Sequence, residues 1–309
     1  MQIRRKINGS IRLTRFKEYL AFVVITTLLG AAAASNGAFG WELIGVLVAN
    51  WLAVAFAFMI NDVEDADDDV LTPCKCQRNP VSARDLSPRT ARLLSFGVAT
   101  ASALTYFTLG KTTFLLGMLT LLISFLYSWK PVRLKNIAIV DFFTHGFMLS
   151  GLQFLTAYFA FDPAPFMHWF FPLLSIYCIS CYGELFNELR DLEGDLKAGL
   201  KHTAAIFGPK VTAQLMGSMM GLGIISGLVT AFVTHLMDIW VLWLVLGLAL
   251  IFILPSIIRV RRCNNGIALQ ESFHKPLEHA AAVALGSQFV LPWTLQHVLP
   301  WLTTFHPPL

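Results

Sequence analysis

The stretch "AVAFAFMINDVEDADDDV", Ala53–Val70, changes character halfway along. It opens with apolar residues that suit a membrane interior, and then places six carboxylates within the eight residues Asp62–Asp69. Like charges packed this closely repel one another. The stretch therefore predicts a membrane-spanning helix whose end holds a positively charged partner.

The composition of the whole chain indicates a membrane protein. Of its 309 residues 56% are hydrophobic and 14% are charged, and the mean hydropathy is +0.63, so the charges are too few to cover a soluble globule of this size. A helical span needs about 20 mostly apolar residues. Nine segments qualify, and they predict an all-α membrane protein with nine transmembrane helices: Tyr19–Ala34, Trp41–Ile60, Leu93–Leu109, Thr112–Trp129, Ile137–Phe161, Phe166–Phe186, Val211–Thr234, Ile239–Ile258 and Ala280–Trp301.

The basic residues indicate the orientation of the chain. With nine spans, the N-terminal segment and the loops after the even-numbered spans hold 22 of the 23 Lys and Arg residues, and only Lys111 falls on the other side. Cytoplasmic loops are enriched in these residues, so we expect a multi-pass protein with a cytoplasmic N-terminus and no removable signal peptide. The net charge of +4 is then explained by cytoplasmic anchoring, and no nucleic-acid partner is expected.

An internal repeat divides the chain. "NDVEDADDD" (Asn61–Asp69) and "NELRDLEGD" (Asn187–Asp195) share the pattern N-[D/E]-x-x-D-x-x-x-D, and each follows an even-numbered span. The repeat predicts two four-helix halves, at about residues 15–135 and 136–262, and a last helix at about 280–301. We expect one domain, residues 1–309, around a central cavity that opens to the cytoplasmic side.

The spacing within each motif predicts a cation site. Residues three, four and seven apart share a helix face, so a helix that continues past the membrane would align Asp62, Asp65 and Asp69. Mg²⁺ prefers oxygen ligands and is often held by one or two carboxylates together with substrate phosphates. Two facing carboxylate rows therefore suit a diphosphate that Mg²⁺ bridges to the protein. Ca²⁺ is disfavoured, because Val70 stands where a calcium loop needs glycine.

These paired motifs, in a chain with nine apolar segments, resemble the UbiA superfamily of intramembrane prenyltransferases, and the resemblance covers nearly the whole chain. It implies Mg²⁺ as cofactor, an isoprenyl diphosphate as donor and a lipophilic acceptor in the membrane lipid. By the pattern of the family, Mg²⁺ and through it the diphosphate are bound by Asn61, Asp62, Asp65, Asp69, Asp191 and Asp195. The internal repeat adds Asn187 to this set.

Three further stretches are similar to segments of the same family. "TPCKCQRNPVSARDLS" from Thr72 contains Arg78, and "GDLKAGLKHTAAIFG" from Gly194 contains Lys201. "YSWKPVRLK", Tyr127–Lys135, resembles a motif of Tyr and Lys in which either Lys130 or Lys135 takes the role of the lysine. Such cations, with Arg133, Arg190 and Lys197 as further candidates, would complete a clamp on the leaving diphosphate. Tyr127 is the aromatic residue best placed to stabilise an allylic cation.

The sequence defines the binding site for the acceptor less clearly than the site for the diphosphate donor. Asp141 and His145 lie one turn apart at the start of the fifth span, where they could form an acid–base pair or simply fix a helix end. Glu184 could likewise have an acid–base role or a structural one. The sequence leaves open a quinone or aromatic precursor, a polyene and a glycerol-lipid as acceptor classes.

The leading interpretation is Mg²⁺-dependent transfer of a prenyl group through an allylic carbocation, with release of diphosphate. A membrane terpene cyclase and a phosphoribosyl-type transferase are alternatives within the family. A cation transporter is an alternative from another class, but transporter sites usually lie near the bilayer midplane. Here the acids begin at the cytoplasmic ends of the second and sixth spans, which favours the enzyme.

Overall fold

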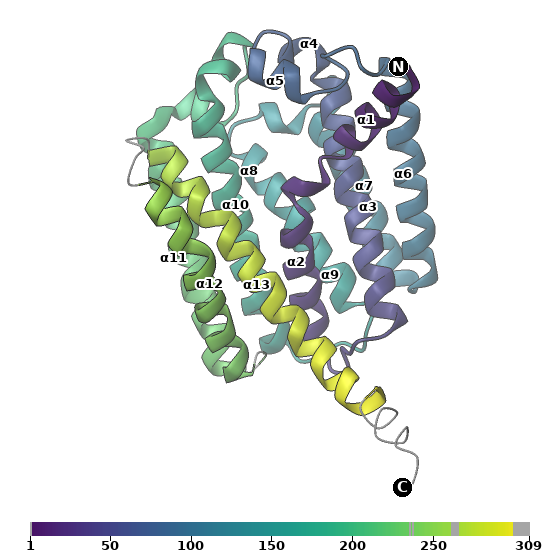
Figure 1. Ribbon diagram of the computed structural model, residues 1–309, viewed down its shortest axis with the longest axis vertical. Coiled ribbons are helices and arrows are strands. Elements are labelled where there is room, and N and C mark those ends of the chain that lie inside the picture. The colour runs from purple at the N-terminus through teal and green to yellow at the C-terminus, as the bar shows by residue number, and fades with distance from the viewer. Residues whose placement is uncertain (1, 235, 237, 261–265, 299–309) are drawn as a thin grey trace, which may run out of the picture.

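The computed structural model describes residues 2–234, 236, 238–260 and 266–298, and the described residues form helices without strands. The helices pack as one elongated bundle (Figure 1). Their bounds are α1 Gln2–Thr14, α2 Leu20–Ala33, α3 Trp41–Glu64, α4 Ala66–Asp69, α5 Pro73–Arg78, α6 Pro88–Thr108, α7 Lys111–Ser128, α8 Val140–Gly146, α9 Leu152–Tyr158, α10 Phe166–Lys197, α11 Thr203–Val233, α12 Ile239–Val260 and α13 Gly266–His297. Short turns lie at Phe16–Glu18 (η1), Leu134–Asn136 (η2) and Phe147–Gly151 (η3).

Each expected span overlaps a helix or a run of helices, and the all-helical prediction is confirmed. By length and composition, four of the described helices could cross a membrane, namely α3, α7, α10 and α11. The number becomes five if Arg5–Glu18 and Leu20–Ala33, bent by 52°, form one span. The count of nine spans stays a prediction, and the boundaries at residue 262 and Trp301 lie outside the described residues.

The fifth expected span is interrupted. It runs as α8, a π-helical turn at Phe147–Gly151 and then α9. Such turns occur often at functional sites. Just before the turn, a Cβ added to Gly146 would lie 2.6 Å from Cys181 Sγ, so only glycine lets α8 pack this closely on α10. This close packing brings the side chains of α8 against the second acidic motif.

A buried polar network connects four helices in the interior of the bundle. Asn50 on α3 is fully buried, and its amide nitrogen donates to Thr27 Oγ1 at 2.9 Å and to the Gln153 carbonyl at 3.1 Å. Its amide oxygen accepts from Tyr106 at 2.5 Å and from Thr156 at 2.9 Å. Because both ends of the amide are satisfied, the network fixes how α2, α3, α6 and α9 pack.

Replacing Asn50 by alanine is expected to destabilise the protein by about 2 kcal/mol, because several buried hydrogen-bonding groups lose their partner. Thermal unfolding in detergent measures the effect. Thr100→Val is the matched control, since Thr100 is exposed and its hydroxyl donates to the Phe96 carbonyl of its own helix, α6. Equal unfolding temperatures for the two variants would contradict a structural role for the network.

Candidate functional site

The first acidic motif does not lie on one continuous helix. α3 ends at Glu64, Asp65 leaves helical geometry with φ −89° and ψ 1°, and Ala66–Asp69 forms the separate short helix α4. The expected single row of Asp62, Asp65 and Asp69 is therefore corrected, because the three carboxylates have different partners. The second motif does lie within one helix, since α10 continues to Lys197.

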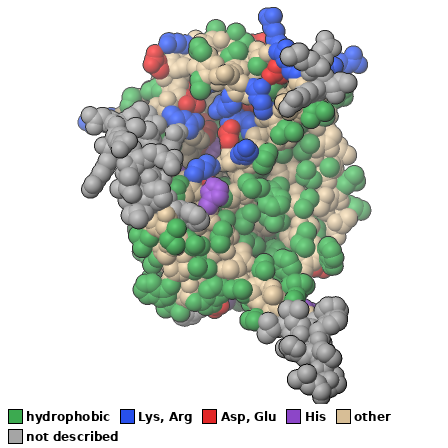
Figure 2. Space-filling model, in the orientation of Figure 1, with side chains coloured by type: hydrophobic (Ala, Val, Ile, Leu, Met, Phe, Trp, Pro, Cys, Tyr) green, Lys and Arg blue, Asp and Glu red, His purple; other side chains and the backbone are tan. Residues whose placement is uncertain are grey.

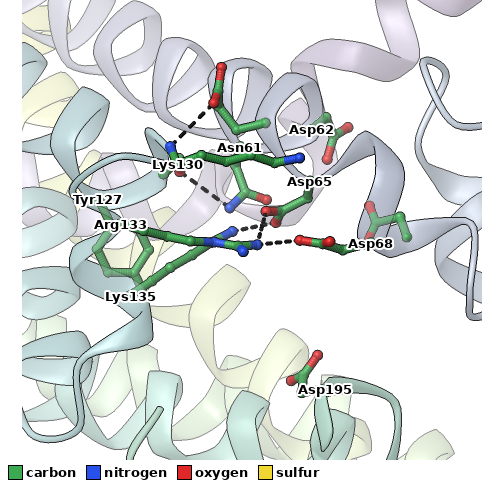
Figure 3. A network of polar contacts seen from close by, with 12 residues as sticks. Asn61, Asp62, Asp65, Asp68, Tyr127, Lys130, Arg133, Lys135 and Asp195 are labelled. Carbon is green, nitrogen blue, oxygen red and sulfur yellow. Dashed lines mark hydrogen bonds and ion pairs between the residues drawn. The ribbon is translucent and has the colours of Figure 1, made fainter. Parts of the chain in front are cut away.

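Asp65 is held between two cations. Arg133 Nη2 donates to Asp65 Oδ1 at 2.9 Å, and Lys135 Nζ pairs with the other oxygen. Arg133 also donates to Asp68 Oδ2 at 2.5 Å (Figure 3). Burial alone would raise the pKa of Asp65, but Lys135 and Arg133 more than offset it, and the pKa is lowered. Asp65 is therefore ionised and already paired with positive charge.

Asp62 and Asp69, the other two aspartates of the expected row, have partners that differ from those of Asp65. Asp69 accepts a hydrogen bond from Asn79 Nδ2 at 2.9 Å, while burial and the charge of Asp65 raise the pKa of Asp69. Asp62 is fully buried, and its Oδ1 lies 3.4 Å from Arg15 Nη1. Its Oδ2 has no hydrogen-bond partner among the described residues. Asp62 thus keeps one oxygen available for a ligand.

Lys75 joins the two motifs. It lies on α5, which follows the first motif, and its Nζ is 2.5 Å from Asp195 Oδ1 and 3.7 Å from Asp191 Oδ2 on α10. Burial would lower the pKa of Lys75, but the two carboxylates raise it by more. Lys75 is therefore a charged bridge between the two halves of the chain.

Both motifs line one small pocket. Figure 3 shows Asp195 across this space from Asp65, Asp68 and Arg133. The pocket has a volume of about 40 Å³, which is room for a few water molecules, so a diphosphate requires it to widen. The lining residues are Asp65, Asp68, Asp69, Thr72, Lys75, Arg133, Gly194, Asp195, Ala198 and Leu200.

The donor set fits magnesium that is shared with a phosphate. Among the residues that the structure describes, no three His, Cys, Asp or Glu side chains are grouped so that they could hold a metal ion by themselves. Mg²⁺ is commonly held by only one or two carboxylates and completes its shell with water and substrate phosphates. The Asp62 oxygen without a partner and the carboxylates of the shared pocket provide ligands of this kind.

The remaining candidates for phosphate binding lie at different depths. Asn61 Nδ2 donates to Ser128 Oγ at 3.3 Å, and Lys130 reaches the exposed Asp67 at 3.0 Å. Lys135 therefore contacts the centre of the first motif, whereas Lys130 contacts its outer side. Arg78 Nε is buried without a hydrogen-bond partner among the described residues. The Lys201 side chain is exposed, and the backbone amide of Lys201 donates to Asn136 at 2.5 Å.

Tyr127 belongs to a second polar cluster deeper in the bundle. Its hydroxyl donates to Glu184 Oε1 at 2.6 Å. The other oxygen of Glu184 lies 3.2 Å from His145 Nε2 and accepts from Asn187 Nδ2 at 3.5 Å. Glu184 thus connects Tyr127 on α7, His145 on α8 and Asn187 on α10.

Asp141 and His145 contact different partners, so the structure does not show the acid–base pair that the sequence left open beside a role in fixing a helix end. Asp141 accepts hydrogen bonds from the Thr203 backbone amide, at 2.5 Å, and from the Thr203 hydroxyl, at 2.6 Å. Thr203 is the first residue of α11, and a carboxylate stabilises the amide groups at a helix N-terminus. Asp141 therefore has a structural role, while His145 pairs with Glu184.

Sequence reasoning missed three residues at this site. Lys75 stands in the basic stretch after the first motif, where Arg78 drew attention instead. Glu188 lies within the second motif and His202 follows it: His202 Nδ1 is 3.1 Å from Glu188, and His202 Nε2 is 3.3 Å from Asp195. The carboxylate density around Asn187 was the available signal for Glu188, whereas a lone histidine gave none.

His202 makes the stability depend on pH. Burial would lower its pKa, but Asp195 and Glu188 raise it to about 9, above the ordinary value of about 6.5. The stabilisation is fully present below about pH 6.5 and is lost as the pH rises through 9. We expect the unfolding temperature, measured without divalent metal, to fall across this window and to fall less in His202→Gln. An equal pH slope in His202→Gln and in the exposed-site control His168→Gln would contradict this prediction.

This chain forms a helical bundle in which two acidic repeat motifs share one pocket. Together, this fold and this site indicate a class of integral membrane proteins. The sequence model of the UbiA prenyltransferase family matches residues 23–274, and the chain belongs to this family. The resemblance inferred from the motifs is thereby confirmed.

Known proteins show how far the similarity extends. The chain is 23% identical over 191 residues to the bacteriochlorophyll synthase 33 kDa chain of Rhodobacter capsulatus, covering 59% of this chain and 60% of that one. It is 25% identical over 193 residues to digeranylgeranylglyceryl phosphate synthase of Methanopyrus kandleri, covering 62% and 66%. The alignments thus span less than two thirds of either relative. The structure of a UbiA homolog from Archaeoglobus fulgidus bound to GPP and Mg²⁺ has a TM-score of 0.69 and 21% identity, and the match covers 92% of this chain and 99% of that one.

Proposed function

We propose that this protein transfers a prenyl group from an isoprenyl diphosphate to a lipophilic acceptor and that the reaction requires Mg²⁺. The observation that carries the proposal is the shared pocket, in which Asp65, Asp68 and Asp69 meet Asp195 beside Lys75 and Arg133. Membership of the family and the GPP and Mg²⁺ bound to the Archaeoglobus homolog support it. The acceptor stays open among the classes that the sequence allows.

The pocket residues suit the departure of diphosphate. Negative charge grows on the leaving group, and positive groups placed where it develops lower the barrier. Asp62, Asp65, Asp69, Asp191 and Asp195 would hold magnesium, which when bound supplies Lewis-acid charge. Lys75, Arg133 and Lys135, now paired with these carboxylates, would transfer their contacts to phosphate oxygens.

The interior of the bundle suits the allylic cation that remains. An aromatic face attracts a cation by about 0.5–2 kcal/mol. Tyr127 is buried, its hydroxyl donates to Glu184 at 2.6 Å, and its ring centroid lies 6.2 Å from that of His145, so the ring is fixed in the cluster around Glu184. We assign Tyr127 to stabilisation of the cation.

The proposal extends to the setting of the reaction. We infer that residues 1–309 act as one integral membrane domain, with the N-terminus and the loops of both motifs in the cytoplasm. Figure 2 supports this orientation, because the charged side chains on this face gather at its upper end above a largely hydrophobic surface. That end carries α1, α4 and α5 (Figure 1).

Release of diphosphate from geranyl diphosphate by the purified full-length protein tests the function. Mg²⁺ and a membrane-lipid extract that supplies acceptors are added, and mass spectrometry identifies the prenylated lipid. We expect release that depends on protein and on the extract. A protein that binds Mg²⁺ but releases no diphosphate from geranyl, farnesyl or geranylgeranyl diphosphate would overturn the proposal.

A further inference from the structure

The polar cluster around Glu184 lies between α7, α8 and α10, outside the acidic pocket. His145 Nε2 on α8 is 3.2 Å from Glu184 Oε2 on α10, and Tyr127 on α7 donates to the other oxygen of Glu184 at 2.6 Å. None of these three residues lines the acidic pocket. The proposed function gives Tyr127 a role, but it gives none to His145 or Glu184.

Close packing of two helices brings His145 to Glu184. The next residue, Gly146, lies against Cys181, which is one turn before Glu184 on α10. The π-helical turn Phe147–Gly151 then begins directly after α8, and such turns are frequent at functional sites. The backbone therefore determines where the imidazole lies.

The contact with Glu184 determines which nitrogen of His145 carries the proton. Glu184 accepts hydrogen bonds from Tyr127 and Asn187, and its one ion-pair partner among the described residues is His145. His145 Nε2 therefore donates to the carboxylate, and the lone pair of the neutral ring is on Nδ1. Nδ1 is buried and has no hydrogen-bond partner among the described residues. A buried group without a partner costs about 1–3 kcal/mol, and a catalytic role is one explanation for keeping it.

Two buried hydroxyl groups extend this pattern one helical turn farther from the acidic motifs. Ser124 is three residues before Tyr127 on α7, and Ser180 is four residues before Glu184 on α10, so each shares a helix face with the cluster. Both hydroxyl oxygens, like His145 Nδ1, are buried without a hydrogen-bond partner in the part of the chain that the structure describes. Polar groups on three helices are thus available to the polar part of a ligand.

We propose that His145 accepts the proton that the acceptor loses on prenylation, that Glu184 positions the imidazole for this step, and that the acceptor reacts through a hydroxyl group. This role rests on the prenyl transfer proposed above. The nucleophile must approach the allylic cation at Tyr127, whose ring centroid is 6.2 Å from that of His145. It therefore arrives beside the imidazole.

A hydroxyl group matches the buried groups of this cluster. It can donate to His145 Nδ1 and accept from a serine hydroxyl, whereas a polyene can do neither. Of the acceptor classes that the sequence leaves open, a phenol or a glycerol-lipid fits this chemistry.

The bonds and charges of the step balance. The allylic carbon–oxygen bond of the donor breaks, and diphosphate leaves with the electron pair. The hydroxyl oxygen of the acceptor gives an electron pair to the allylic carbon and forms an ether bond, while its proton goes to His145 Nδ1. The imidazolium that results is stabilised by the negative charge of Glu184.

The fate of the prenyl group tests this role. Purified full-length protein is given geranyl diphosphate, Mg²⁺ and the membrane-lipid extract, and released diphosphate, prenylated lipid and geraniol are measured in one sample. His145→Gln can still donate to Glu184 but cannot take up a proton, so we expect prenylated lipid to form at least about a hundredfold more slowly. Release of diphosphate should fall much less, because the donor ionises before the proton moves, and water then captures the cation as geraniol.

Glu184→Gln should change the ratio of prenylated lipid to diphosphate in the same direction, because an amide donor opposite Nε2 moves the imidazole proton to Nδ1. His168→Gln, at an exposed histidine, is the matched control and should keep the wild-type ratio. A wild-type ratio in His145→Gln would overturn the role of His145. An equal loss of release and of prenylated lipid in that variant would also overturn it, since this is the result of a purely structural contact.

Acetylation of the extract tests the hydroxyl group separately. Acetic anhydride blocks hydroxyl groups, so we expect the acetylated extract to support no transfer by the wild type. Equal transfer with the acetylated and the untreated extract would overturn a hydroxyl acceptor. Absence of release by the wild type with the untreated extract would instead overturn the proposed function, and the role of His145 with it.

Discussion

Asp65→Asn is expected to lower the rate of diphosphate release from geranyl diphosphate by at least about a hundredfold, the typical effect of removing one group that stabilises developing charge. The substitution keeps the size of the side chain and removes the charge that pairs with Arg133 and Lys135. Both the proposed metal ligand and the placement of two cations are then lost. Initial rates at saturating Mg²⁺ measure the effect.

The second motif provides the partner experiment. Asp191→Asn should cause a loss of similar size, because Asp191 lies one turn before Asp195 on α10 and 3.7 Å from Lys75, which lines the pocket. Asp67→Asn is the matched control, since the Asp67 side chain is 87% exposed and, among the described residues, its one ion pair is with Lys130; we expect less than about a threefold change there. Thermal unfolding shows whether each variant is folded. Wild-type turnover in both Asp65→Asn and Asp191→Asn would refute the site.

Removal of divalent metal is expected to have the largest effect, with diphosphate release falling by about a thousandfold or more when the metal's charge on the leaving group is lost. The reason is electrostatic, because the carboxylates of both motifs repel a diphosphate unless a cation lies between them. Treatment with a chelator, followed by titration with Mg²⁺, measures the loss and its recovery.

Binding of geranyl diphosphate, measured by calorimetry, should weaken in parallel with turnover when the metal is removed. Ca²⁺ should restore turnover less well than Mg²⁺, because the two ions differ in size and preferred geometry. Transfer that continues unchanged in the presence of chelator would contradict the role assigned to the carboxylates, whatever the acceptor proves to be.

Local patterns predicted most of the helices and the position of both motifs. Long apolar runs define α3 and α10, and the period of the helix placed Asp191 and Asp195 correctly on one element. The first motif departs from that period, because successive aspartates are poor helix formers and repel one another. The helix consequently ends at Glu64 and Asp65 can turn toward Arg133.

Contacts between residues that are far apart along the chain could not be predicted from the sequence. Lys75 and Asp195 are 120 residues apart, and no local spacing reveals that they meet. Asp141 is a second example: its spacing of four residues left contact with His145 open, whereas in the structure it accepts hydrogen bonds from Thr203 at the start of α11. One sequence without relatives contains no signal that would choose between these partners.

The bridge formed by Lys75 gives the protein a built-in counter-ion. Its ammonium group lines the pocket and pairs with Asp191 and Asp195, so it neutralises part of the negative charge there and links α5 to α10. If the proposed function holds, the Lys75 ammonium group would exchange these carboxylates for phosphate oxygens of the donor, and magnesium held by the carboxylates would supply the charge that compensates them. A single side chain would thus first preserve the resting enzyme and then help it recognise its substrate.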